Sequence, residues 1–140
     1  MWNVCTFLFV LYTQPLSQIL FNHSCPHQFF AYDTQLHKSC GPEHYGDTRN
    51  ALQTCISDIK DWMTENKLQL NADKTEKMLF NSSKLTHLPA PLSICQATIS
   101  SSDSVRNLGF YLDKDLFMKE HINFICKTAF LEIRRIRPIL

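Results

Sequence analysis

The sequence predicts an α+β fold in which a small antiparallel sheet is covered by helices on one face. Apolar residues recur at helical spacing near both ends and in the middle of the chain. Short extended segments lie between these regions, and turn-forming residues separate the segments. Because the segments do not alternate as regular strand–helix repeats, an α+β arrangement is favoured over a parallel α/β sheet.

Composition is typical of a folded domain. The chain has 140 residues, of which 44% are hydrophobic and 19% charged, so it can bury a core and is unlike a disordered chain. The formal net charge is only +1. Bulk charge therefore does not indicate a nucleic-acid or membrane partner, and any electrostatic argument must be local.

A first helix is expected from Thr6 to about Asn22, with a kink or restart at Pro15. Its first turns are apolar on nearly all sides, which predicts that they are buried. The apolar run at residues 4–12 is too short for a bilayer, which takes roughly 20 residues. It also lacks a preceding Lys or Arg and a clear cleavage site. We expect no membrane partner and a cytoplasmic or nuclear location.

A hairpin and a second helix are predicted next. Residues 28–31 and 34–37 are two short extended segments around a tight turn. The clearest helix carries an apolar stripe between Leu52 and Met63, which predicts a core-facing side. Asp47 or Thr48 is expected to cap its start and Asn66 to end it.

The C-terminal half is predicted to be extended first and helical last. The expected extended segments are residues 68–71, 75–80, 94–99 and 105–112, the last around Gly109. Residues 100–104 form a polar, turn-like cluster. A final helix is expected from about Phe117, with an apolar stripe that contains Ile122, Ile125, Cys126, Ala129, Ile133 and Ile136.

The six cysteines are expected to be reduced, and several fall on apolar faces. A disulfide framework would need a secretory context, for which the sequence gives little support. His23, Cys25, His27, His37 and Cys40 offer soft metal ligands, but their spacing fits no common zinc pattern.

Several motifs together resemble one family. Residues 30–36, Phe-Ala-Tyr-Asp-Thr-Gln-Leu, resemble the Tyr-Ala-Asp-Asp-Thr-Gln-Leu box of LINE-type (non-LTR retrotransposon) reverse transcriptases. Residues 9–16 are similar to the family's preceding helix, residues 62–76 to its lysine-bearing turn, and residues 104–113 to the strand pair called the primer grip. The resemblance implies a partial palm over residues 1–115 and the start of a thumb helix over residues 116–140.

The resemblance also implies a chemistry, RNA-directed DNA polymerisation on an RNA template with a DNA primer. That reaction uses two Mg²⁺ ions, which prefer carboxylate oxygens. Asp33 matches the second box aspartate, whereas Tyr32 replaces the first, and a neutral phenol is a poor ligand for a hard dication. No segment of the chain matches the family's earlier aspartate strand. We therefore expect Asp33 to be a vestigial ligand and the chain to be inactive.

The remaining site residues are also implied by the resemblance. Lys74 matches a lysine proposed as a general acid, although a solvated lysine in a polar turn is the favoured alternative. Nucleic-acid contacts are expected from Arg106, Gly109, Lys127, Arg134 and Arg135, the alternative for the cations being a solvated helix face. Phe30, Tyr32 and Phe110 are expected in the core, with stacking on nucleotides as the alternative.

Three functions are compatible with these residues. The first is an inactive fragment of a retrotransposon reverse transcriptase. The second is a residual, non-specific nucleic-acid-binding module, and the third is part of a longer, active polymerase.

Overall fold

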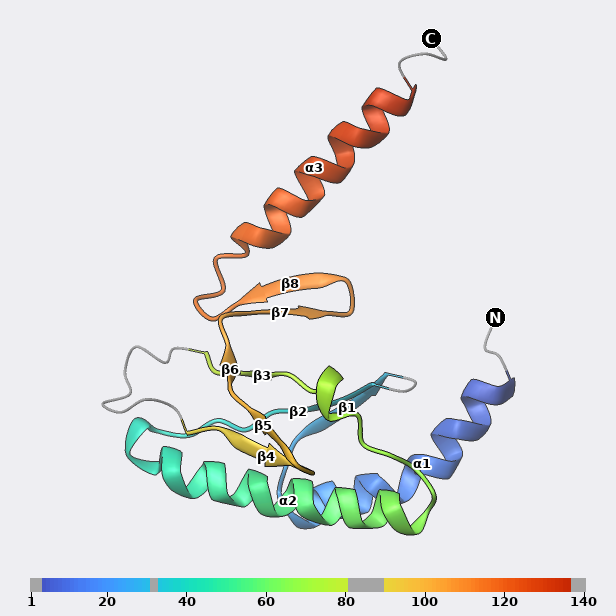
Figure 1. Cartoon of the computed structure of the whole chain (residues 1–140), viewed down its shortest axis with the longest axis vertical. Coiled ribbons are helices and arrows are strands. Elements are labelled where there is room, and N and C mark those ends of the chain that lie inside the picture. Colours follow the sequence, from blue (N-terminus) through green and yellow to red (C-terminus); the bar gives the residue numbers. More distant parts are fainter. Residues whose placement is uncertain (1–3, 31–32, 81–89, 137–140) are drawn as a thin grey trace. The chain divides into compact units, whose positions relative to one another are not determined.

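The computed structural model describes residues 4–30, 33–80 and 90–136, and it confirms the α+β class (Figure 1). The chain divides into two compact units. The first contains Met1–Lys74 and Ala90–Ile99, and the second contains Thr75–Pro89 and Ser100–Leu140. Among the described residues, no helix is both long enough and apolar enough to cross a bilayer. The resemblance implies a boundary between palm and thumb near residue 115, and that boundary stays a prediction.

The first unit is built from two long helices and two hairpins. Its elements are α1 (Val4–Asn22), β1 (His27–Phe30), β2 (Asp33–Leu36), the 3₁₀ turn η1 (Pro42–His44), α2 (Tyr45–Glu65), the 3₁₀ turn η2 (Ala72–Lys74), β4 (Leu92–Ile94) and β5 (Ala97–Ile99). Its core contains Leu16, Leu20, Cys25, Cys55 and Ile59. Phe29 of β1 and Leu36 of β2 pack against this core, so both helices contribute to one hydrophobic layer with the β1–β2 hairpin.

Helix α1 is continuous through Pro15, and its axis changes direction in the middle of the helix (Figure 1). Pro15 has no N–H to donate to the preceding turn, which explains the predicted kink. The prediction that the first turns are buried is wrong. Phe7, Leu8 and Leu11 are each more than half exposed, because the described core begins only at Leu16.

Helix α2 begins earlier than predicted. It starts at Tyr45, and its first residues follow directly from η1, whose Pro42 has the backbone angle that a helical turn needs. Neither Asp47 nor Thr48 caps the start, and the N-cap His44 makes no side-chain capping bond. The predicted end is confirmed, because the Asn66 side-chain amide donates to the carbonyl of Trp62 at 2.8 Å.

One polar face of α2 binds the backbone that leads into β4. The Tyr45 hydroxyl donates to the carbonyl of Ala90, and the Arg49 guanidinium donates twice to the carbonyl of Pro91 at 3.1 and 2.7 Å. The Gln53 amide donates to the Ser93 carbonyl at 2.7 Å and accepts from its N–H at 2.8 Å. Gln53 therefore satisfies the β4 backbone as a neighbouring strand would.

The segment 94–99 is a hairpin rather than the single strand predicted. Leu92, Ser93 and Ile94 pair antiparallel with Ile99, Thr98 and Ala97. Cys95 turns the chain at a φ of +55°, a conformation usually taken by Gly or Asn. The sequence carries no such residue there, which is why the turn was not predicted.

The second unit contains β3 (Lys77–Met78), β6 (Ser101–Ser102), β7 (Ser104–Asn107), β8 (Phe110–Asp113) and α3 (Lys119–Ile136). Strands β3 and β6 pair in parallel, and β7 pairs antiparallel with β8. The described strands of the whole chain thus form four two-stranded ladders rather than one antiparallel sheet. Residues 100–104 contain β6 and the start of β7 instead of a turn, and residues 68–71 form no strand.

Helix α3 packs on the β7–β8 hairpin by its first turns only. The Phe110 and His121 rings lie 4.8 Å apart, and the Tyr111 and Phe124 rings 5.3 Å apart. The Ser104 hydroxyl also hydrogen-bonds the Glu120 carboxylate. Beyond Phe124 the helix is exposed on every side, so its predicted apolar stripe has no cover among the described residues.

Replacement of Leu20 by Ala tests the α1–α2 core. Leu20 has no exposed surface, so its truncation should lower the free energy of unfolding by about 2–5 kcal/mol. The neighbouring Phe21 is 75% exposed, and Phe21→Ala should change that free energy by less than about 1 kcal/mol. Urea unfolding followed by circular dichroism measures both, and equal losses would contradict the described core.

Candidate nucleic-acid interface

Asp33 and Lys74 both lie in the first unit. Asp33 opens β2, pairs with Phe30 across the hairpin and is exposed. Lys74 ends η2 and is also exposed, and its backbone N–H donates to the Asn71 side-chain oxygen at 3.2 Å. Within the described part of the chain, no hydrogen bond or ion pair joins the Asp33 and Lys74 side chains. Tyr32 lies outside the described residues.

The donor set around Asp33 does not fit a two-metal centre. Within residues 4–30, 33–80 and 90–136, no three His, Cys, Asp or Glu side chains gather where they could hold a metal ion. A pair of Mg²⁺ ions needs several oxygen ligands that converge, and a single exposed carboxylate does not provide them. We therefore derive no catalytic step through Mg²⁺ for this chain.

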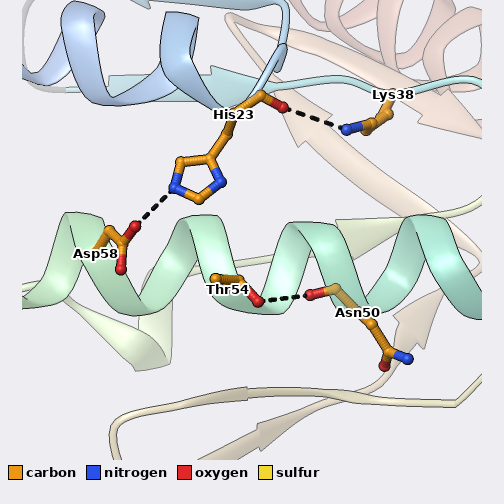
Figure 2. Close-up of polar contacts among 5 residues, drawn as sticks. All are labelled: His23, Lys38, Asn50, Thr54 and Asp58. Atoms are coloured by element: carbon orange, nitrogen blue, oxygen red, sulfur yellow. Dashed lines mark hydrogen bonds and ion pairs between the residues drawn. The ribbon is translucent and has the colours of Figure 1, made fainter.

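The histidines near the end of α1 have partners of other kinds. His23 Nε2 lies 2.6 Å from an Asp58 carboxylate oxygen, and Lys38 Nζ donates to the His23 carbonyl at 3.4 Å (Figure 2). His27 uses both ring nitrogens, one towards the Ser17 hydroxyl and one towards the Cys25 carbonyl. These contacts tie α1, β1 and α2 together, and they occupy both ring nitrogens of His27.

Arg106 and Gly109 lie on the β7–β8 hairpin. The Arg106 guanidinium lies 5.6 Å from the Tyr111 ring centre and 6.0 Å from the Phe124 ring centre, so two aromatic faces hold it. Gly109 adopts a φ of +89° in the two-residue turn, next to Leu108 at +48°. Positive angles at both positions match the tight turn that suits the twist of paired strands.

The three cations of α3 lie on one face of that helix. At 3.6 residues per turn, Lys127, Arg134 and Arg135 fall on the side that also carries Phe124, whereas the apolar stripe lies on the opposite side. Arg135 contacts Glu132 at 2.7 Å. Among the described residues, no carboxylate pairs with Lys127 or Arg134, and both are exposed. Arg106 and these cations therefore form a basic face of the second unit.

Sequence reasoning missed the aromatic members of this face. Tyr111 follows from the hairpin register, which places it opposite Arg106, once the two-residue turn is known. Phe124 carried no such signal, since only the packing of α3 brings it to the guanidinium. The expectation that Phe30 and Phe110 are core residues is wrong, because they are 39% and 53% exposed.

Comparison of the chain with protein-family models, with curated proteins and with solved structures gives no match. The basis for assigning a function is therefore the chain's own residues. The candidate site residues separate into Asp33 and Lys74 in the first unit and a basic, aromatic face in the second.

Replacement of Gly109 by Ala tests the hairpin that presents Arg106. A side chain at a φ of +89° is strained, so the β7–β8 amides should lose protection by about 1 kcal/mol in local opening free energy. Gly46→Ala is the matched control, because Gly46 lies inside α2 with open space around it. The control should stabilise its helix slightly. Hydrogen exchange read by NMR measures both, and unchanged protection at β7–β8 would argue against the turn.

Proposed function

We propose that the chain is part of a non-LTR retrotransposon reverse transcriptase, with a partial palm over residues 1–115 and the start of a thumb over residues 116–140. In the chain as it stands, the polymerase is inactive. The supporting observation is that two family motifs fall on tight hairpins, the aspartate box on β1–β2 and the primer-grip segment on β7–β8. Both hairpins are what the family resemblance requires at these positions.

Inactivity follows from the carboxylates. Asp33 is the only match to the family's box aspartates, and Tyr32 stands in the place of its partner. Metal ions supply several kcal/mol of transition-state stabilisation, and about 1.4 kcal/mol corresponds to a tenfold change in rate. Loss of ligands should therefore lower the rate by many orders of magnitude. Lys74 is exposed at the end of a polar 3₁₀ turn, and we assign it to that solvated turn rather than to general acid catalysis.

Primer extension tests the proposed inactivity. Purified chain is incubated with Mg²⁺, deoxynucleotides and a DNA primer annealed to an RNA template, beside an active reverse transcriptase as positive control. We expect no extended product above the buffer blank. Magnesium-dependent extension that disappears in Asp33→Asn would overturn the proposal, and extension that survives this change would indicate a contaminating polymerase.

A second function is supported by the basic face of the second unit. Arg106 is held by two rings, and Lys127 and Arg134 are free to contact phosphates. Along a helix axis, Lys127 and Arg134 are about 10 Å apart, so each can contact a different phosphate of one strand. The face would then bind nucleic acid weakly and without sequence preference.

Salt dependence tests this binding. For a labelled single-stranded oligonucleotide, the logarithm of the affinity should fall with the logarithm of salt concentration by about 0.7 per phosphate contact. The double variant Lys127→Gln/Arg134→Gln should therefore lower that slope by about 1.4. The control Lys60→Gln/Lys67→Gln removes the same charge from exposed positions of the first unit. Equal slopes for the two variants would show that the basic face is not the binding surface.

A longer product remains the third hypothesis. The genomic reading frame before the Met1 codon decides it, because a longer polymerase must encode an aspartate-bearing strand there. An in-frame stop close to that codon, with no such strand encoded beyond it, would exclude the longer product.

A further inference from the structure

Two free thiols lie in one buried cluster in the core of the first unit. Cys25 and Cys55 are 3% and 1% exposed and belong to the same buried cluster. Each thiol is close enough to the other to affect its pKa. The Cys25 thiol donates to the Pro26 carbonyl at 3.9 Å. The fold therefore brings the two cysteines into one buried cluster, although 29 residues separate them in the sequence.

The backbone on both sides of this pair is held in place. Cys25 follows the end of α1, where its N–H donates to the Leu20 carbonyl at 2.9 Å. Two residues before it, His23 reaches across to Asp58, which lies three residues beyond Cys55 on α2 (Figure 2). The 2.6 Å contact between them joins the same two segments that the thiols join. Contacts other than those of the thiols therefore hold the two segments together.

We propose that Cys25 and Cys55 form a reversible intramolecular disulfide by exchange with a low-molecular-weight disulfide of the glutathione type. The thiolate of one cysteine attacks the small disulfide, forms a mixed disulfide and releases one small thiol. The other cysteine loses its proton and attacks the protein sulfur of the mixed disulfide, which releases the second small thiol. The protein loses two electrons and two protons, and the small disulfide gains both.

The surroundings of each thiol slow its attack on a small disulfide. Burial raises the pKa of both, and it raises that of Cys55 to about 11, with a further increase from the neighbouring Cys25. Lys38 opposes the increase in the pKa of both thiols. Thiolates are therefore scarce at both positions in the closed fold, and either cysteine can begin the exchange once the two helices separate locally.

Burial also distinguishes this pair from the other described cysteines. Cys40, Cys95 and Cys126 are exposed, so a small disulfide reaches them directly. Cys25 and Cys55 become accessible only when α1 and α2 separate locally. Their oxidation should be slower than that of the exposed thiols but should end in a bond that joins the end of α1 to α2. This proposal does not depend on the polymerase resemblance.

The test uses the full chain with Cys5, Cys40, Cys95 and Cys126 replaced by Ser. The chain is equilibrated with reduced and oxidised glutathione, quenched with acid and analysed by mass spectrometry. From the oxidised fraction, the effective concentration of one thiol for the other is obtained in buffer and in concentrated guanidinium chloride. The folded chain should show a value at least about tenfold higher, because the fold already brings the sulfurs together.

Two results would overturn the proposal. One is an effective concentration that is equal or lower in buffer, which would mean that the fold does not favour the bond. The other is a folded chain that carries only mixed disulfides with glutathione. Adding Cys55→Ser to the same background provides the control, since Cys25 then has no partner and should stop at the mixed disulfide.

Discussion

The packing of α1 against α2 around Leu20 and Cys55 is the constraint on which the first unit depends. These two side chains are the largest that are completely buried in the described chain. The β1–β2 hairpin reaches the same layer through Phe29 and Leu36, and the β4 backbone is bound by the polar face of α2. Loss of the α1–α2 contact would therefore remove the layer on which the β1–β2 hairpin packs, whereas α2 by itself still binds β4. A core this small leaves little excess stability.

Both ends of the described chain expose apolar side chains that the core does not use. Leu8 and Leu11 of α1 and Ile133 of α3 are each more than half exposed. Continuous apolar surfaces of this kind are usually contact surfaces rather than solvent-facing ones. In α3 the apolar stripe lies opposite the basic face, so a cover on the stripe would leave the cations accessible.

Local patterns predicted the elements, whereas contacts between elements could not be predicted. Helical spacing located α2, two short extended segments located the β1–β2 hairpin, and the family resemblance implied a strand pair where β7 and β8 lie. The β4–β5 turn was missed because Cys95 takes a positive φ without a glycine to indicate it. The family resemblance implied nucleic-acid contacts from the cations of the basic face, but the place of Phe124 beside Arg106 depends on how α3 packs. The Cys25–Cys55 contact has no signature in the sequence, because 29 intervening residues separate the two thiols.

Metal-dependent polymerisation and phosphate binding make different demands on geometry. This difference explains how phosphate binding can be kept when polymerisation is lost. Metal-dependent polymerisation needs several carboxylates held together to within a fraction of an ångström, so the loss of one ligand disables it. Phosphate binding needs only cations on a common face, and their contributions are separate. Tyr111 and Phe124 restrict Arg106 in advance, which lowers the entropy lost when it binds a phosphate. A chain that cannot hold Mg²⁺ productively at Asp33 would therefore still keep the physical basis for weak nucleic-acid binding.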